Sequence, residues 1–313
     1  MTLVRTLTIL ATGPQASVQG APRTGHRHLG VPWAGAADPL SLALANRLLG
    51  NALTAPGIEA PFGLSVRLGT DCAVAVTGAD AALSVEGAPV AAHAVLLLRA
   101  GQFLVIAPPR RGARSYLAVA GGLAVPDVLG SPSTYLPAGL GGHEGRALVP
   151  GDVLTLAAPG LRAPAATPAR FRPAFSGVLR AVPSAEFTWL SADAQATLFA
   201  ERFAVSRLAD RMGLRLDGPP LAVRPDPLPS GAVFPGTVQL PPGGAPILLG
   251  PDAQATGGYP RVAAVISADR YLYGQLRPGD AVRFYRRTPE EAARDTRAKT
   301  ALWREWLGEG WSG

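Results

Sequence analysis

The chain has 313 residues and a formal net charge of +7 at pH 7, with 48% hydrophobic and 16% charged residues. That length suffices for two ordinary domains, and the apolar content excludes an intrinsically disordered protein. No apolar run reaches the roughly 18 residues that a membrane-spanning helix needs, and the single cysteine, Cys72, excludes an internal disulfide and a multi-cysteine metal site. Residues 1–5 alternate apolar and polar types without a basic lead, which predicts a first strand and no secretion signal. Together with the lone cysteine, this predicts a cytoplasmic protein with no membrane partner.

The positive charge comes from scattered arginines. The densest cluster, Arg110, Arg111 and Arg114, has no interleaved aromatic residues on which bases could stack, so we expect no nucleic-acid partner. Lys299 is the only lysine and stands between alanine and threonine, which excludes a Gly-Lys-Ser/Thr phosphate loop. Its polar surroundings also differ from those of a biotin-carrying lysine. We therefore expect that another polypeptide supplies ATP or biotin, if either is used.

Short apolar segments separated by Gly, Pro or Asp dominate the chain. The predicted strands are 6–10, 64–68, 72–76, 95–98, 103–106, 115–120, 153–156, 238–240, 247–249, 262–266 and 282–284. Strands at such close spacing are typical of sandwiches and barrels.

Helices are few, and each of the three predicted ones has a recognisable start. The first begins at Asp38-Pro39 and stops at Gly50-Asn51. A second begins at Ser191 and runs to about residue 200. The last begins at a Thr-x-x-Glu capping box, residues 288–291, and runs to about residue 307.

Two similar Pro-Gly-Asp turns, residues 150–152 and 278–280, each lead into a short apolar strand. Proline presets one backbone angle of such a turn and glycine accepts a positive one. A segment rich in proline and alanine, 158–173, lies between the halves and is typical of a linker. We expect two related β domains, residues 1–170 and 171–313; chance recurrence of a common turn is the alternative.

No self-contained catalytic motif is present, neither a Gly-x-Ser-x-Gly elbow nor a His-Glu-x-x-His pair, so no catalytic residue is assigned. His26 and His28 would share one face of a strand, but no third ligand is evident and we expect no metal. Asp38 is better explained as a helix cap than as a catalytic acid. For the neighbours Asp210 and Arg211 we expect a simple ion pair.

An ordered series of motifs resembles one protein family. In chain order the motifs are residues 17–19, 23–25, 29–32, 34–38, 45–51, 77–80, 114–122, 129–131, 133–135, 142–146, 210–213, 218–221, 235–236 with Gln239, Gln254 with 256–260, and 276–284. Over roughly residues 3 to 285 they resemble the biotin-dependent carboxyltransferase-like family, whose members include allophanate hydrolase subunit 2 and the 5-oxoprolinase C subunit.

The resemblance implies a mainly β fold: two cyclophilin-like β-barrel domains with a few short helices and a cleft between the barrels. It also implies homologues of the 5-oxoprolinase A and B subunits as partners, in a hydrolase complex that opens 5-oxoproline to glutamate with ATP hydrolysis. No cofactor is expected on this chain alone, and ATP is expected at the complex. Two alternatives stay open: a biotin-dependent carboxyltransferase acting on a urea-like or amide acceptor, and a non-catalytic regulatory partner like the relative that regulates a sporulation kinase. Biotin belongs only to the first alternative.

Polar residues and glycines within the matching segments are the candidates for binding a small anionic or amide substrate. Arginines could clamp a carboxylate or phosphate, side-chain amides and hydroxyls could hydrogen-bond it, and glycines could let backbone N–H groups face it. The candidates are Gln19, Arg23, Arg114, Arg146, Arg211, Gln239, Gln254, Thr256, Gly257, Gly258 and Tyr259.

The chain departs from the family pattern at several polar positions. Gly20, Ala34, Pro132, Gly231 and Ala253 stand where relatives usually have Asp, Ser, Arg, Glu and Arg. The glycines and prolines of the pattern largely remain. These departures weaken the transfer of a particular reaction more than the transfer of the fold, because function resides in the site.

Overall fold

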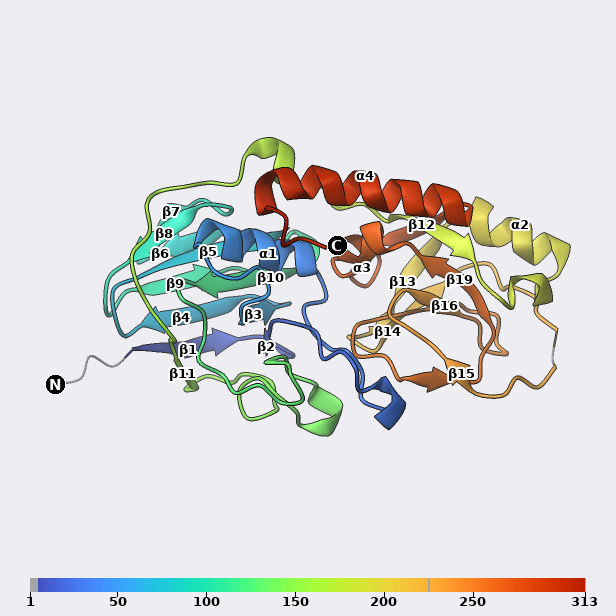
Figure 1. The fold of residues 1–313 in the computed structure, drawn as a ribbon, viewed down its shortest axis with the longest axis horizontal. Coiled ribbons are helices and arrows are strands. Elements are labelled where there is room, and N and C mark those ends of the chain that lie inside the picture. Colours follow the sequence, from blue (N-terminus) through green and yellow to red (C-terminus); the bar gives the residue numbers. More distant parts are fainter. Residues whose placement is uncertain (1–4, 225, 313) are drawn as a thin grey trace. The chain divides into compact units, whose positions relative to one another are not determined.

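The structure is a computed structural model that describes residues 5–224 and 226–312. Most of the predicted first strand, residues 1–4, lies outside the described residues. The chain divides into two compact units. Unit 1 comprises Met1–Arg23, Ala34–Ala174 and Trp303–Trp311, and unit 2 comprises Thr24–Trp33, Phe175–Leu302 and Ser312–Gly313. Both are built mainly from strands (Figure 1), which confirms the predicted mainly β class.

Unit 1 contains two sheets. The six-stranded sheet has the order β11 (Val153–Thr155), β1 (Thr6–Thr12), β4 (Leu64–Leu68), β9 (Phe103–Ile106), β6 (Leu83–Val85), β7 (Ala88–Val90). The five-stranded sheet has the order β2 (Ser17–Gln19), β3 (Gly57–Ala60), β10 (Arg111–Val119), β5 (Cys72–Asp80), β8 (Val95–Leu98). One apolar core, with fully buried Leu7, Ile58, Val74 and Leu104, is formed by residues of both sheets.

Helix α1 (Pro39–Leu48) lies against β5 and β10 of the five-stranded sheet (Figure 1). Its start is as predicted: the Asp38 carboxylate accepts hydrogen bonds from Ser41 N at 2.9 Å and Ser41 Oγ at 2.5 Å, and proline occupies the first turn. Unit 1 also contains two 3₁₀ helices, Leu136–Ala138 and Ala169–Phe171.

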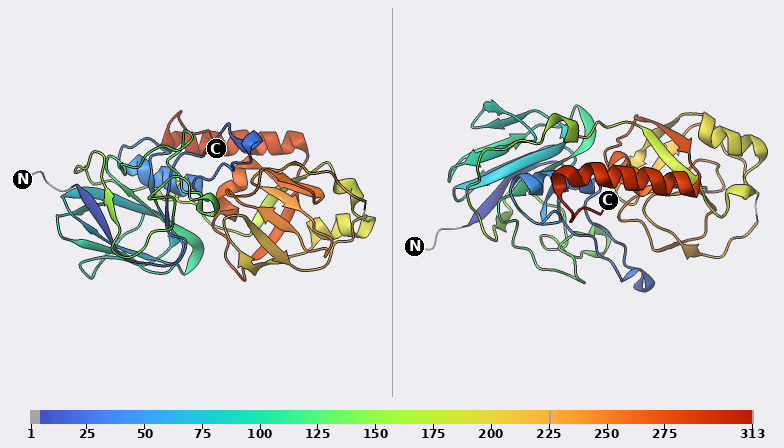
Figure 2. Two further views of the ribbon diagram at one scale, coloured as in Figure 1. Left: turned by 90° about the horizontal axis from the view of Figure 1, so that it is seen from below. Right: turned by 45° about the horizontal axis from the view of Figure 1, so that its top comes forward.

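Unit 2 is a closed barrel of seven strands. Their order is β12 (Val178–Pro183), β19 (Arg261–Val265), β16 (Thr237–Gln239), β17 (Ile247–Leu249), β14 (Gly213–Asp217), β13 (Phe203–Ala209), β20 (Ala281–Arg286). The parallel pairing of β12 with β20 closes the ring, which is visible in the left view of Figure 2. Side chains alternate between the two faces of a strand, so Leu214, Leu216 and Leu248 fill the barrel while their neighbours face outward.

Short elements surround the barrel of unit 2. They are α2 (Ala192–Ala200), α3 (Arg270–Tyr273), the two-stranded sheet of β15 (Gly231–Ala232) and β18 (Thr256–Gly257), and 3₁₀ helices at Arg27–Leu29, Phe187–Trp189 and Ser267–Asp269. Ser191 caps α2 as predicted, accepting a hydrogen bond from Ala194 N at 3.2 Å.

The last helix, α4 (Pro289–Leu307), belongs to unit 2 up to residue 302 and to unit 1 from residue 303. The predicted capping box is present: Thr288 N donates to Glu291 Oε2 at 2.9 Å, and Glu291 N donates to Thr288 Oγ1 at 3.2 Å. No helix in the described part of the chain combines the length and the apolar character needed to cross a membrane.

The two Pro-Gly-Asp turns have the same backbone hydrogen bonds. In unit 1, Ile9 N donates to the carbonyl of the turn aspartate at 2.8 Å, and the turn glycine N donates to Ile9 O at 2.8 Å. In unit 2, Val205 makes the corresponding bonds at 2.9 and 2.8 Å. The strand register shifts directly after Ile9 in β1 and after Val205 in β13. This shared geometry favours the duplication hypothesis over chance recurrence.

Candidate functional site

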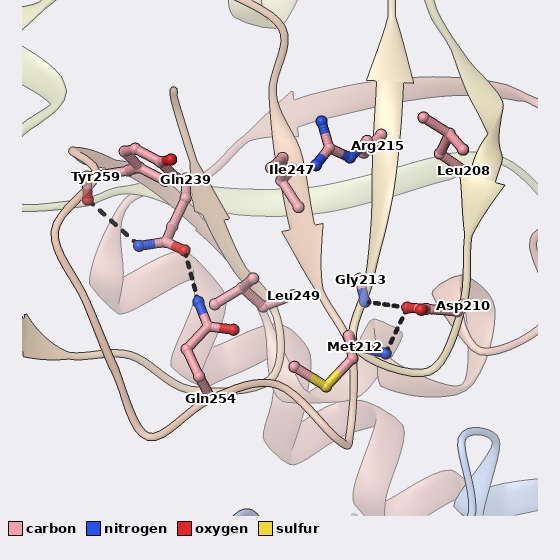
Figure 3. Close-up of a pocket in the computed structure, with 10 residues that line it drawn as sticks. All are labelled: Leu208, Asp210, Met212, Gly213, Arg215, Gln239, Ile247, Leu249, Gln254 and Tyr259. Atoms are coloured by element: carbon pink, nitrogen blue, oxygen red, sulfur yellow. Dashed lines mark hydrogen bonds between the residues drawn. The ribbon is translucent and has the colours of Figure 1, made fainter. Parts of the chain in front are cut away.

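A pocket of about 230 Å³ opens on the outer face of the barrel in unit 2 (Figure 3). Strands β13, β14, β16 and β17 provide its floor, and the segment between β17 and β19 provides one wall. Its lining residues are Leu208, Asp210, Met212, Gly213, Arg215, Gln239, Ile247, Leu249, Gln254 and Tyr259. The pocket thus combines an apolar floor with two side-chain amides, one guanidinium and one carboxylate, the mixture that orients small polar ligands.

Two glutamines form a chain of amide hydrogen bonds in this pocket. Gln254 Nε2 donates to Gln239 Oε1 at 3.2 Å, and Gln239 Nε2 donates to Tyr259 O at 3.4 Å. Gln239 is 1% exposed, so its amide orientation is set by the protein, whereas Gln254 is only partly buried. Figure 3 shows both amides on the same side of the pocket, with the Gln254 oxygen turned away from Gln239. The arrangement offers a donor and an acceptor to a ligand amide.

Gly257, on β18, makes the close approach to Gln239 possible. A Cβ added at Gly257 would lie 2.5 Å from Gln239 Nε2, whereas one added at Gly258 would meet nothing closer than 3.6 Å. The neighbouring Thr256 side chain is exposed. Of these predicted site residues, Gly257 therefore shapes the amide site through its lack of a side chain.

Arg27 supports the backbone beneath Gln254. Its Nη2 donates to Gln254 O at 3.0 Å and also to Val233 O. The guanidinium carbon lies 5.0 Å from the ring centre of Phe234 and 5.6 Å from that of Trp33. Burial lowers the pKa of Arg27 below its usual range. Sequence reasoning missed this residue, since the neighbouring histidines drew attention instead.

The turn between β13 and β14 corrects one sequence expectation. Asp210 does not pair with its neighbour: its Oδ1 accepts from Met212 N at 2.8 Å and Gly213 N at 3.2 Å, which caps the turn. Arg211 instead forms a two-point ion pair with Asp252, Nε–Oδ2 at 2.9 Å and Nη2–Oδ1 at 2.8 Å. Both side chains are buried, at 4% and 1% exposure, because each satisfies the charge of the other.

The predicted site residues of unit 1 are used inside that unit. Gln19 Nε2 donates to Thr134 O at 3.1 Å, and Arg23 Nη2 donates to Ser133 O at 2.7 Å. Arg146 makes a two-point bond with Asp152 at 2.8 Å for each contact, and that ion pair holds the pKa of Asp152 at about 2. These contacts fix loops of unit 1.

Arg114 belongs to a buried polar cluster beside α1. Its Nε lies 3.2 Å from Glu59 Oε1, while Tyr116 OH donates to Glu59 Oε2 at 2.8 Å and Asp38 N donates to Tyr116 OH at 2.8 Å. Burial, with the nearby carboxylates of Glu59 and Asp38, raises the pKa of Tyr116 well above its ordinary value. The tyrosine therefore stays protonated and serves as a donor that holds the start of α1.

No three His, Cys, Asp or Glu side chains among residues 5–224 and 226–312 are grouped so that they could hold a metal ion. The prediction that His26 and His28 share one face of a strand is wrong. His28 lies in the 3₁₀ helix Arg27–Leu29, and His26 directly precedes that helix. The helical turn directs the two side chains differently from a strand.

Two departures from the family pattern are neighbours in space. A Cβ added at Gly20 would come within 2.8 Å of Pro132 Cγ, so the acidic and basic residues usual in relatives would face each other there. Because this chain lacks both the acidic and the basic side chain, neither charge is left without a partner at these two positions. In unit 2, Ala253 is fully buried, at 0% exposure, and packs in a small core cluster with Val233 and Leu249.

The comparisons with known proteins agree with this fold. Residues 29–286 match the family described as carboxyltransferase domain, subdomain A and B. The chain belongs to this family.

Among its relatives are the 5-oxoprolinase C subunits of two bacteria. The chain is 38% identical over 296 residues to that of Escherichia coli K12, covering 91% of this chain and 93% of the relative. It is 38% identical over 292 residues to that of Haemophilus influenzae, again covering 91% and 93%. The crystal structure of K. lactis urea amidolyase superimposes with a TM-score of 0.91 at 26% identity, covering 100% of this chain but 20% of that much longer chain.

Proposed function

We propose that the chain is one subunit of an ATP-dependent 5-oxoprolinase, which opens the cyclic amide 5-oxoproline to glutamate and requires homologues of the A and B subunits. The carrying observation is the 38% identity to the 5-oxoprolinase C subunit, which covers 91% of this chain and 93% of the relative. Such coverage in both directions indicates an equivalent polypeptide rather than a shared module. Because ATP is the proposed co-substrate, we expect the complex to work in the cytoplasm.

The reaction poses a defined physical problem, because a lactam is an unreactive amide. Transfer of the γ-phosphoryl group of ATP to the amide oxygen would release ADP and activate the ring. Water then adds to the carbonyl carbon and the ring nitrogen leaves as the amine of glutamate, and a second water hydrolyses the resulting acyl phosphate to the carboxylate and free phosphate. The protein must hold the ring, exclude competing water and stabilise the developing oxyanion.

The pocket on the barrel of unit 2 has groups suited to the first of these tasks. Gln239 is held between Gln254 and the Tyr259 carbonyl, so its amide is oriented before a ligand arrives. An oriented amide loses less entropy on binding than a mobile one. Ile247 and Leu249 offer apolar contact to ring methylenes. In this proposal the chain binds and orients the lactam, and partner subunits supply the ATP site.

A biotin-dependent carboxyltransferase is the second candidate, supported by the TM-score of 0.91 to K. lactis urea amidolyase. Because this chain covers only 20% of urea amidolyase, the activity of urea amidolyase transfers less directly to this chain. The regulatory alternative has no such structural relative among those described above. Under the carboxyltransferase hypothesis, the pocket amides would bind urea or the ureido ring of biotin.

Co-purification with homologues of the A and B subunits tests the proposal. The complete complex should form glutamate from 5-oxoproline only with ATP, and omission of this chain should abolish the reaction. A parallel reaction with urea, bicarbonate, ATP and a biotinylated carrier should give no carboxylated product. Carboxylation there, without glutamate formation, would favour the second candidate; a stable complex without either activity would favour a regulatory partner.

A further inference from the structure

Three pocket residues of different chemistry stand in one row across the barrel of unit 2. Arg215 on β14 is paired in register with Ile247 on β17, and Ile247 is paired with Gln239 on β16. All three line the pocket, so their side chains share the outer face of the sheet. The row therefore presents a cation, an apolar side chain and an amide in that order, as Figure 3 shows.

The spacing of the row suits a small ligand. Neighbouring strands lie about 4.8 Å apart, so the Cα atoms of Arg215 and Gln239 are separated by roughly 10 Å. In Figure 3 the Arg215 guanidinium extends from β14 toward Ile247, whereas the Gln239 amide points toward Gln254 and the Tyr259 carbonyl. A single small ring lying on Ile247 can thus reach the amide with one edge and the guanidinium with the other. Gly213, in the next row of the same face, adds no side chain that would fill this space.

The charge of Arg215 is available to a ligand. The side chain is exposed, and among residues 5–224 and 226–312 it forms no ion pair or hydrogen bond. Asp210, the acidic residue of the lining, lies at the β13–β14 turn, with Oδ1 engaged by Met212 N and Gly213 N. A guanidinium in this position can bind a carboxylate through two parallel hydrogen bonds.

We infer that Arg215 is the specificity-determining residue of the pocket and binds the carboxylate of a cyclic amino-acid lactam while Gln239 and Gln254 bind its amide. The inference rests on the proposed function and deepens it. In 5-oxoproline the carboxylate is on the ring carbon at one side of the lactam nitrogen and the carbonyl is at the other side, so a ring lying on Ile247 can turn its carbonyl edge to the glutamines and its carboxylate to Arg215. Urea and neutral lactams lack the anion, so Arg215 would separate a 5-oxoprolinase substrate from a urea-like one.

The test uses the complex with homologues of the A and B subunits, with 5-oxoproline as substrate and 2-pyrrolidinone, the same ring without the carboxylate, as competitive inhibitor. Arg215→Gln should raise KM for 5-oxoproline about 10- to 100-fold, the loss expected for one charge-assisted contact, with kcat changed much less. The Ki of 2-pyrrolidinone should stay within about twofold, because that ring does not contact the guanidinium. Arg215→Lys should recover part of the affinity, since an ammonium keeps the charge but not the planar fork.

Arg283→Gln is the matched control, because Arg283 is an exposed arginine on β20 outside the pocket lining and its loss should leave both constants unchanged. If Arg215→Gln raises KM for 5-oxoproline and Ki for 2-pyrrolidinone equally, or raises neither, the inference is overturned. If the complete wild-type complex forms no glutamate, the proposed function fails instead. Calorimetric titration of 5-oxoproline into the isolated chain then decides about Arg215: binding lost in Arg215→Gln supports the inference, and no binding or undiminished binding refutes it.

Discussion

Arg211 and Asp252 form a buried two-point ion pair that joins the two backbone segments on either side of the pocket in unit 2, with N–O distances of 2.8 and 2.9 Å. Asp252 N also donates to Arg211 O at 3.0 Å. One segment carries Asp210 and Met212 of the lining, and the other carries Gln254. The pair therefore links the stability of the barrel to the geometry of the pocket.

Removing one partner of this pair should be costly. Asp252→Ala leaves the Arg211 guanidinium buried without its carboxylate, and we expect the free energy of unfolding to fall by about 3–5 kcal/mol. Urea unfolding followed by tryptophan fluorescence measures it. Asp226→Ala is the control, because its pair with Arg224 is exposed and should contribute less than about 1 kcal/mol. Equal losses in the two variants would contradict the assigned role of the buried pair.

A methyl group at residue 257 should affect binding more than stability. In Gly257→Ala the added Cβ would meet the Gln239 amide nitrogen at 2.5 Å, and that side-chain end can move, so the amide is displaced while the barrel persists. We expect KM for 5-oxoproline to rise about tenfold or more and the melting temperature to change by only a few degrees. Gly258→Ala, whose Cβ would have only ordinary contacts, should match the wild type in both measurements. A matching rise in KM for both alanine variants would argue against the amide site.

Loss of Arg27 should loosen the wall that carries Gln254. Arg27→Ala removes the hydrogen bonds to the carbonyls of Val233 and Gln254, and we expect faster hydrogen exchange in residues 250–256 together with a loss of about 1–3 kcal/mol in stability. His28→Ala, at an exposed position in the same 3₁₀ turn, should leave both unchanged. Unaltered exchange in Arg27→Ala would show that the wall is held by other contacts.

His93 should make unit 1 less stable in mild acid. Burial, reinforced by the charge of Arg172, lowers the pKa of His93 to about 4, whereas an unfolded histidine has a pKa near 6.5. Between those values the unfolded chain binds a proton that the folded chain does not, so the free energy of unfolding falls as the pH drops from about 6.5 to 4.

The variant His93→Asn removes this group at a position with φ of 58°, which asparagine tolerates. Urea midpoints measured from pH 7.5 to 4 should therefore decline less steeply in His93→Asn than in the wild type. Parallel pH curves for the two proteins would contradict the assignment.

Much of the fold could be predicted because short apolar runs between turn residues specify strands locally. The predicted strands at 64–68, 95–98, 103–106 and 247–249 have the observed bounds. Strands β13 and β14 were missed. Strand β13 is irregular after Val205, and the alternation of Leu with Arg and Asp in β14, which is typical of a half-buried strand, spans only five residues. These two strands carry Arg215 and the β13–β14 turn, and the site was therefore only half predicted.

Local patterns along the chain were enough to specify the mainly β class, the helix starts with their caps and the two equivalent turns, whereas the resemblance to a protein family singled out Gln239, Gln254 and Tyr259. Caps, turns and alternation depend on residues a few positions apart, so their chemistry can be recognised without coordinates. The folded chain was needed to show that Arg211 pairs with Asp252 rather than with its neighbour, that Arg27 supports Gln254, and that Arg215 shares a row with Gln239. Those relationships join residues distant in the chain, and strand register and burial, which no local pattern encodes, bring them together.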